Sequence, residues 1–241
     1  MDFPLNPKLT VARAQLGIER QPVVIVDDVL RDPAAMIDFA AQQVEFVPAW
    51  TAAGGYPGVR APAPVDYASM LVRALSPMIE DVFLLGAAKP ARVDCYLSIV
   101  TTLPDQLTPL QRIPHIDTVD PLRIAILHYL CDERFGSTAF FRHRATGFET
   151  ISAARETTYL QARDRELAAA EPPAGYIRAD SPNYEQIEAV QCRYNRVVIY
   201  RSQLLHCGVI PPCMTFSNDP KLGRLTANVF VNYSSNGSGV N

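Results

Sequence analysis

The stretch LQRIPHIDTVDPLRIAILHYL, residues 110–130, places a histidine and an aspartate two positions apart, directly before an apolar run typical of a β-strand. In an extended backbone, residues i and i+2 point to the same side, so His115 and Asp117 would converge on one point. The pair could bind a metal ion, or it could belong to an ordinary turn before the strand. Taken alone, the pair does not distinguish a metal site from a turn, because a His-x-Asp spacing arises by chance in roughly a quarter of such chains.

Further short strands surround this stretch and predict a mainly β fold. Two helices are expected near the start of the chain: one announced by Asp32 and Pro33, and one over 66–82 that Pro77 should kink or split. The Gly- and Pro-rich segment between these helices is expected to be a loop. Apolar or alternating runs predict strands at 22–28, 91–100, 122–131, 137–143, 196–200, 204–210 and 224–233.

The order of these elements indicates the fold class. Helices first, and then many short strands without regular βαβ alternation, are typical of an α+β, mainly β chain whose sheets form a sandwich or barrel. A polar interval at about 150–190 is expected to be a helical insertion. We expect one domain over residues 1–241, with N-terminal strand and helices (1–90), a β core (91–233) and a flexible tail (234–241).

The composition restricts the possible partners. The chain has 241 residues, 48% of them hydrophobic, and a formal net charge of -3 without a basic run. We therefore expect a small-molecule or peptide partner and neither nucleic acid nor membrane. The N-terminus lacks the pattern of a signal peptide, so a cytoplasmic location is expected. Five cysteines without paired short spacings predict reduced thiols. The oligomeric state stays open, a homodimer included.

A third metal ligand is needed if His115 and Asp117 bind an ion. His128 lies inside a predicted strand and His143 lies in a basic segment, whereas His206 lies in an apolar strand that ends before a double proline. His206 is therefore the better candidate, although a histidine in such a place can also be an ordinary core residue. Two imidazoles and one carboxylate form the ligand set of non-haem Fe(II).

The strand RLTANVFVNY, residues 224–233, suggests a binding site for a carboxylate. Its alternation places Arg224 and Thr226 on one face and apolar residues on the other. A guanidinium and a hydroxyl that face an interior need an acceptor, because burying them unpaired is costly. A carboxylate would satisfy both groups. The alternative is a cross-strand pair on the surface.

Taken together and in this order, His115-x-Asp117, His206 and Arg224-x-Thr226 resemble the Fe(II)/2-oxoglutarate-dependent dioxygenase superfamily, in particular its prolyl 4-hydroxylase-like branch and a bacterial group within it. The similarity includes PVVIVDDVLRDP, AILHYL and GSTAFFRH and spans about residues 22–233. It implies a double-stranded β-helix, a jelly-roll or cupin-like barrel with the metal inside its mouth and helices supporting its outer face.

The resemblance also implies roles for single residues. Arg224 would bind the distal carboxylate of 2-oxoglutarate, assisted by Thr226, and His128 and Tyr96 would contact the same co-substrate. These two residues could equally be packed core residues. Fe(II) would be bound by His115, Asp117 and His206. With O2 as the other co-substrate, hydroxylation is the expected reaction, because halogenating relatives have a small residue in the place of the aspartate.

One departure from the family concerns the arginine. Arg224 follows His206 by 18 residues, which is a longer gap than the family commonly has. The intervening residues could form a longer loop between strands, and Arg201 is the alternative candidate. In GGYPGVRAP, Tyr56 and Arg60 either belong to a simple turn-rich loop or line the substrate entrance.

The leading functional hypothesis is an Fe(II)- and 2-oxoglutarate-dependent oxygenase, a hydroxylase of a peptide, an amino acid or another small molecule. The alternatives are a cupin-like metal- or ligand-binding module without turnover and a zinc-dependent hydrolase or isomerase on the same barrel. A binding module has no reason to keep Arg224 in addition to the metal ligands, so the full set favours the oxygenase. The sequence does not identify the substrate, because loops that carry no recognisable code determine it.

Overall fold

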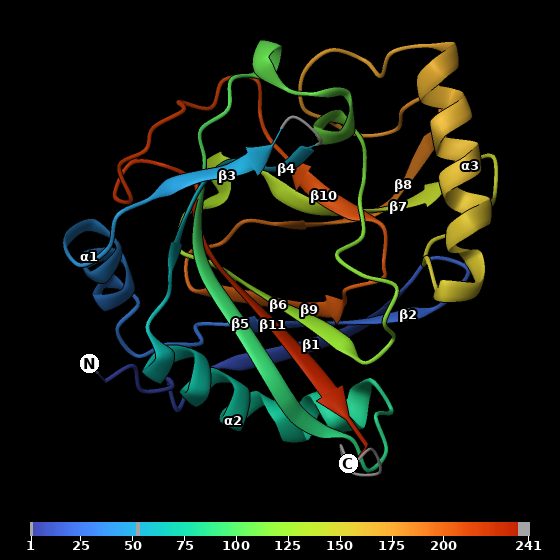
Figure 1. The fold of residues 1–241 in the computed structure, drawn as a ribbon. Helices are drawn as coiled ribbons and strands as arrows, with labels where there is room; N and C mark the ends of the chain where they lie inside the picture. The colour runs from blue at the N-terminus through green and yellow to red at the C-terminus, as the bar shows by residue number, and fades with distance from the viewer. Residues whose placement is uncertain (1, 52–53, 236–241) are drawn as a thin grey trace, which may run out of the picture.

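The computed structural model describes residues 2–51 and 54–235. Within these residues the strands form two antiparallel sheets, one of eight strands in the order β1-β2-β9-β6-β11-β5-β4-β3 and one of three in the order β10-β7-β8 (Figure 1). The large sheet consists of β1 (Thr10–Leu16), β2 (Gln21–Asp27), β9 (Arg196–Arg201), β6 (Arg123–Tyr129), β11 (Leu225–Ser234), β5 (Lys89–Val100), β4 (Gly54–Pro62) and β3 (Val47–Thr51). The small sheet consists of β10 (His206–Val209), β7 (Ser137–His143) and β8 (Tyr184–Gln191).

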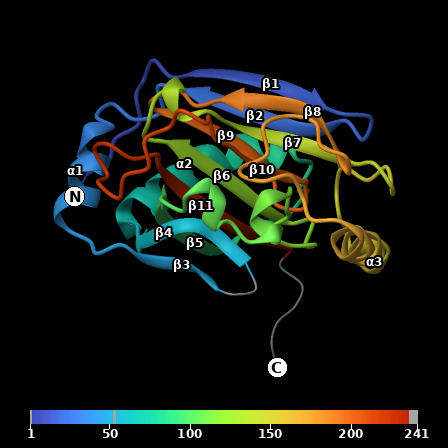
Figure 2. The ribbon, with the colours of Figure 1, turned by 90° about the horizontal axis from the view of Figure 1, so that it is seen from above.

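Three α-helices and three short 3-10 helices complete the described fold. The α-helices are α1 (Ala34–Gln42), α2 (Val65–Val82) and α3 (Ala153–Ala169), and the 3-10 helices are η1 (Pro104–Gln106), η2 (Pro109–Arg112) and η3 (Glu133–Phe135). Figure 2 shows α1 and α3 at opposite ends of the molecule. None of the helices in the described ranges is long and apolar enough to cross a membrane.

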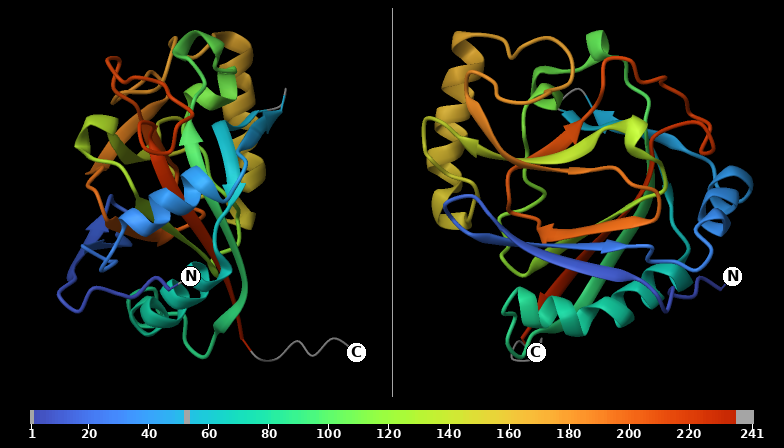
Figure 3. Two further views of the ribbon diagram at one scale, coloured as in Figure 1. Left: turned by 90° about the vertical axis from the view of Figure 1, so that its left-hand side faces the viewer. Right: turned by 180° about the vertical axis from the view of Figure 1, so that it is seen from behind.

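The large sheet has an outer face covered by helices and an inner face turned toward the small sheet. Along β9, Val197 and Ile199 pack into the cluster that contains the buried side chains of α1 and α2. Val198 and Tyr200 alternate with them and pack with residues of both sheets instead. Figure 3 shows α2 lying along the large sheet, near the ends of β5 and β11. The result is a mainly β sandwich of the jelly-roll type, as expected from the alternating strands.

The helices follow the predicted ranges closely. The Asp32 carboxylate accepts a hydrogen bond of 3.1 Å from the backbone N–H of Ala34, and α1 begins one residue after Pro33. The predicted second helix is one continuous element from Val65 to Val82, so Pro77 does not split it. Its long apolar face, which includes Leu71, Leu75 and Ile79, packs against the sheet and outweighs the lost hydrogen bond.

One prediction for the chain is wrong, and another holds only for α3, the first part of its range. The segment expected to be a loop contains β4, which pairs with β5 in antiparallel register. Gly58 is required there, because a Cβ at this position would lie 2.0 Å from the carbonyl oxygen of Ile99. The interval expected to be helical ends in β8, whose half-exposed, polar sequence hides its strand character. Of the expected flexible tail, residues 236–241 lie outside the described residues, and Ser234 belongs to β11.

Candidate metal centre

Three side chains that were predicted to bind a metal lie next to one another. One ligand atom from each of His115, Asp117 and His206 lies within 4.8 Å of the others. The Asp117 carboxylate is 3.9 Å from the Nε2 atom of each histidine, and the two imidazole rings are 4.5 Å apart between centroids. Two imidazoles and a carboxylate facing one point can hold a divalent transition metal on one side and leave its other side open.

Backbone hydrogen bonds place these residues. His115 and His206 form an isolated β-bridge, in which each backbone N–H donates to the other carbonyl oxygen at 3.0 and 2.9 Å. The backbone N–H of Asp117 donates to the carbonyl oxygen of Ser202 at 2.9 Å. The segment that follows η2 is therefore not a regular strand, but the bridge gives it the extended form that the His-x-Asp spacing predicted.

The His206 ring has a defined tautomer. Its Nδ1 atom lies 2.8 Å from the carbonyl oxygen of Leu204, and because a carbonyl can only accept, Nδ1 carries the hydrogen. The lone pair is then on Nε2, the atom that faces Asp117. A backbone contact of this kind orients a metal-binding histidine and keeps it ready to coordinate.

The electrostatic environment favours neutral imidazole. Partial enclosure in the cavity, and then the nearby His206 ring and Arg60 guanidinium, hold the pKa of His115 below its ordinary value of 6.5. Loss of water raises the pKa of Asp117, an effect that His206, Arg123, Ser202 and Arg60 oppose. Neutral imidazole is the form that binds metal, so His115 needs no deprotonation near neutral pH.

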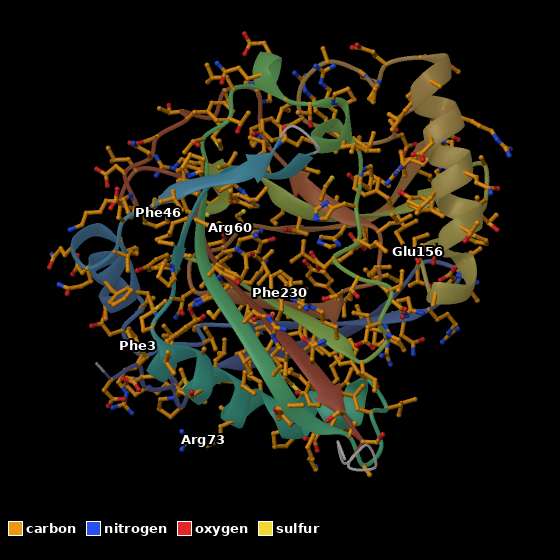
Figure 4. All side chains as sticks on the ribbon, in the orientation of Figure 1. Phe3, Phe46, Arg60, Arg73, Glu156 and Phe230 are labelled. Carbon is orange, nitrogen blue, oxygen red and sulfur yellow. The ribbon has the colours of Figure 1, made fainter. Side chains whose placement is uncertain are left out.

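The three residues line a cavity of about 510 Å³ between the two sheets. The large sheet contributes Leu127 and Asn228, the small sheet contributes Thr138, and α3 closes one side. Figure 4 shows Arg60 and Phe230 in the middle of the molecule and Glu156 on α3; all three line this cavity. The volume is in the range of a small-molecule site.

Arg224 and Thr226 lie inside the same cavity and are both buried. The Arg224 guanidinium donates from Nε to the carbonyl oxygen of Phe135 at 3.0 Å and from a terminal nitrogen to that of Ser137 at 3.3 Å. Tyr56 lies beside these residues; its hydroxyl is buried, and Thr226 is the one described residue that offers it a side-chain contact, too long for a regular hydrogen bond. The long gap after His206 forms an irregular loop between β10 and β11, as one interpretation of the sequence required.

The alternative arginine lies elsewhere. Arg201 donates to the carbonyl oxygens of Pro121 and Phe83, and its guanidinium stacks over the Phe83 ring at 5.7 Å. Phe83 belongs to the cluster on the outer face of the sheet. Between the two candidates, only Arg224 lines the cavity.

Two residues that were predicted to contact the co-substrate do not line the cavity. His128 is fully buried on the outer face, where its nitrogens lie 2.9 Å from the Tyr67 hydroxyl and 3.2 Å from the Asn195 side-chain oxygen. It does not line the cavity, because it alternates with Leu127, which does. Tyr96 is 39% exposed and also lies outside the cavity lining, with its ring against the Arg60 guanidinium.

Other cavity residues received no role from the sequence. Tyr159 comes from α3 and Tyr176 from the segment before β8, and both line the cavity. The Tyr176 hydroxyl donates to the carbonyl oxygen of Thr102 at 2.8 Å. Neither belongs to a motif, because the wall they form arises from tertiary packing. Tyr56 and Arg60 do line the cavity, as one of the two interpretations of their segment proposed.

The chain belongs to a protein family whose model matches residues 7–231 and whose description is a family of unknown function (DUF6445). None of the curated proteins matches it. Its fold is similar to that of HygX from Streptomyces hygroscopicus, solved with nickel and 2-oxoglutarate bound, with a TM-score of 0.50, 12% identity and coverage of 89% of this chain and 84% of HygX. SnoN, a non-heme alpha ketoglutarate dependent epimerase from nogalamycin biosynthesis, gives a TM-score of 0.48, 12% identity and coverage of 92% and 86%.

Proposed function

We propose that this protein is a non-haem Fe(II)- and 2-oxoglutarate-dependent oxygenase. The observation that carries the proposal is the convergence of His115, Asp117 and His206 in a cavity that also contains Arg224. Each group has a chemical reason to be there in an oxygenase, and together they have no evident structural role. The shared fold with HygX agrees with the proposal.

The metal site suits Fe(II). Two imidazoles and one carboxylate are the protein ligands that non-haem Fe(II) oxygenases use, and they leave positions for a chelating co-substrate and O2. The side chain of His115 keeps 55% of its surface accessible, whereas that of His206 keeps 7%. The open side of the site therefore lies toward His115 and the cavity.

The group beside the metal site suits the distal carboxylate of 2-oxoglutarate. The buried Arg224 guanidinium, the Thr226 hydroxyl and the Tyr56 hydroxyl, which forms no regular hydrogen bond with the described residues, all line the cavity. A buried hydroxyl without a partner costs free energy, and a carboxylate oxygen would accept its hydrogen bond. We propose that these three residues hold the co-substrate, with Tyr56 in the role that the sequence assigned to His128 and Tyr96.

In this proposal the residues of the chain bind the metal and the co-substrate, orient them and shield them from water. Bound Fe(II) and 2-oxoglutarate supply the oxidising chemistry, with O2 as the oxidant. Leu204 orients His206 through its carbonyl, and Arg224 fixes one end of the co-substrate. The aromatic side chains of Tyr159, Tyr176 and Phe230 limit the access of water to the cavity. Hydroxylation of a peptide, an amino acid or another small molecule is the proposed outcome, because Asp117 occupies the position that halogenases leave open.

An anaerobic titration tests this function. Protein with Fe(II) should develop a visible charge-transfer band when 2-oxoglutarate is added, and succinate should form on exposure to air. Arg224→Gln should raise the concentration of 2-oxoglutarate needed for half of the band by about tenfold or more, because it loses a charge-assisted contact. The matched control Arg201→Gln, outside the cavity, should leave this concentration unchanged.

The same experiment separates the alternatives. Absence of the band and of succinate would sink the oxygenase proposal. A band without succinate, even with a broad panel of candidate substrates, would identify a binding module without turnover. Binding of Zn(II) with hydrolytic activity and no response to 2-oxoglutarate would identify a hydrolase.

A further inference from the structure

Building on the oxygenase function proposed above, we infer that the primary substrate carries a carboxylate group and that Arg60 binds it. Arg60 lies on β4, on the inner face of the large sheet, and lines the same cavity as the metal-binding residues. Its register partner on β5 is Ser98, which in turn pairs with Thr226 on β11. The guanidinium therefore belongs to the row of side chains that includes the proposed co-substrate site.

Arg60 has no acceptor of its own. Among residues 2–51 and 54–235 it forms neither a hydrogen bond nor an ion pair, and its Nε atom is buried without a partner. The other arginines of the cavity differ: Arg224 donates to backbone carbonyls, and Arg163 donates to Asp164 at 2.7 and 2.9 Å. A buried charged donor without an acceptor is costly, and an anionic ligand removes that cost.

Two aromatic rings hold the guanidinium in place. Its central carbon lies 4.8 Å from the centre of the Tyr56 ring and 5.6 Å from that of Tyr96. Stacking of this kind leaves the nitrogen edge of the planar group free to donate two parallel hydrogen bonds, the geometry that matches a carboxylate. Tyr96, which does not reach the cavity, thereby acts as a positioning residue for Arg60.

The charges of the proposed complex leave Arg60 unbalanced. The carboxylate of Asp117 and the two carboxylates of 2-oxoglutarate together balance the charges of Fe(II) and Arg224. The positive charge of Arg60 then remains in the half-buried wall of the cavity without a counter-charge. Glu156 is the other carboxylate of the cavity wall, but it is exposed and belongs to α3, on the far side of the view from Arg60 (Figure 4). A substrate carboxylate is the remaining way to neutralise Arg60.

The other residues of the cavity wall indicate the chemistry of the rest of the substrate. The cavity is also lined by apolar and aromatic side chains from several elements, among them Ile113, Tyr159, Leu160 and Phe230, next to the charged Glu156 and Arg163 of α3. Such a wall favours an apolar body by burial of its surface. The structure therefore points to an amphiphilic carboxylic acid, with its carboxylate at Arg60 and its apolar part against these apolar and aromatic side chains.

Calorimetry with matched probes tests this inference. Phenylacetate, 3-phenylpropanoate and 4-phenylbutanoate are each compared with the corresponding neutral amide, using anaerobic protein that contains Fe(II) and 2-oxoglutarate. At least one carboxylate should bind about tenfold more tightly than its amide, because only the carboxylate forms charge-assisted hydrogen bonds. Arg60→Gln should remove the difference, and Arg60→Lys should restore part of it. Arg73→Gln, an exposed arginine of α2, is the control and should keep the difference.

Each other outcome has a definite meaning. Equal affinities of acid and amide in the wild type, including no measurable binding of either, would overturn the inference, as would a difference that survives Arg60→Gln. If the wild type forms the 2-oxoglutarate band and Arg60→Gln loses it, Arg60 binds the co-substrate, and the inference fails while the proposed function stands. If the wild type forms no band, the proposed function fails and takes the inference with it.

Discussion

The outer and inner faces of the large sheet are built from the same strands but differ in whether their buried polar side chains have hydrogen-bond partners. On the outer face the one buried histidine, His128, has a partner for each ring nitrogen, Tyr67 and Asn195. On the inner face the Tyr56 hydroxyl and the Arg60 Nε atom are buried without a partner among the described residues. Polarity alone therefore does not identify the binding face, whereas unsatisfied hydrogen-bonding capacity does.

The largest effect is expected from removal of a proposed metal ligand on the inner side. Asp117→Ala should lower the affinity for Fe(II) by more than about 100-fold, because even residues that only orient metal ligands cost 10- to 100-fold. Metal titration measures the affinity, and thermal unfolding should show little loss of stability, because Asp117 is not part of the core. The exposed Asp105→Ala is the control. If Asp117→Ala keeps its affinity for Fe(II), the proposed metal site is wrong.

Neighbouring residues on β6 allow a direct comparison of the two faces. Ile126 faces the outer cluster and is 1% exposed, whereas Leu127 borders the cavity. Ile126→Ala should lower the free energy of unfolding by about 2–5 kcal/mol, because it leaves a void in a packed core. Leu127→Ala should cost less, because the space beside it is already open. Chemical denaturation measures both, and equal losses would contradict the difference between the faces.

His128 provides a test in which the sequence and the structure disagree. His128→Ala should lower the free energy of unfolding by about 1–3 kcal/mol, because it leaves the Tyr67 hydroxyl and Asn195 short of partners. Its affinity for 2-oxoglutarate, measured by the anaerobic titration, should equal that of the wild type. Weakened binding of 2-oxoglutarate at unchanged stability would instead return His128 to the site.

The smallest effect concerns a charge on the inner face that does have a partner. Asp27 accepts hydrogen bonds from Arg196 at 2.6 and 2.9 Å. The side-chain hydrogen bond from Arg196 lowers the pKa of Asp27 below its ordinary value of 3.8, although burial opposes the shift. The pair therefore stabilises the fold above that ordinary value, and the stabilisation is lost as the pH falls through the lower folded pKa.

Asp27→Asn should lower the free energy of unfolding by about 1–2 kcal/mol at pH 7, and the gap to the wild type should close as the solution is acidified below about pH 4. Denaturation at several pH values checks this dependence. A gap that is independent of pH would mean that the ion pair does not stabilise the fold. Metal binding at pH 7 should be unaffected, because Asp27 does not line the cavity.

The fold was predictable where the strands are buried and alternate. The range 137–143 matches β7, and the range 66–82 matches α2 within one residue. The strands that were missed have other sequences: β4 contains glycine and proline because it passes close to β5, and β1 is exposed on six of its seven residues. Their strand character depends on tertiary pairing, which periodicity does not reveal.

The candidate site was predictable where a spacing encodes it. His115-x-Asp117 and Arg224-x-Thr226 are local patterns, and the structure places both pairs and His206 in one cavity. The transfer of a family position failed for His128 because a shift of one residue along a strand changes the face. Tyr96 does lie on the inner face, as the register partner of Asn228, but outside the cavity lining. The walls contributed by Tyr159 and Tyr176 come from distant segments, and no local pattern could have indicated them.

The position of α3 has a consequence for protein engineering. The helix adds Glu156, Tyr159, Leu160 and Arg163 to the cavity wall, while the proposed metal ligands lie after η2 and on β10. One face of a single helix can thus be randomised without altering the backbone that joins His115 to His206. A library at Glu156, Leu160 and Arg163 would explore new ligands. Tyr159 should be kept, because it is 3% exposed and packs in the cluster that contains Leu205 and Cys207, the neighbours of His206.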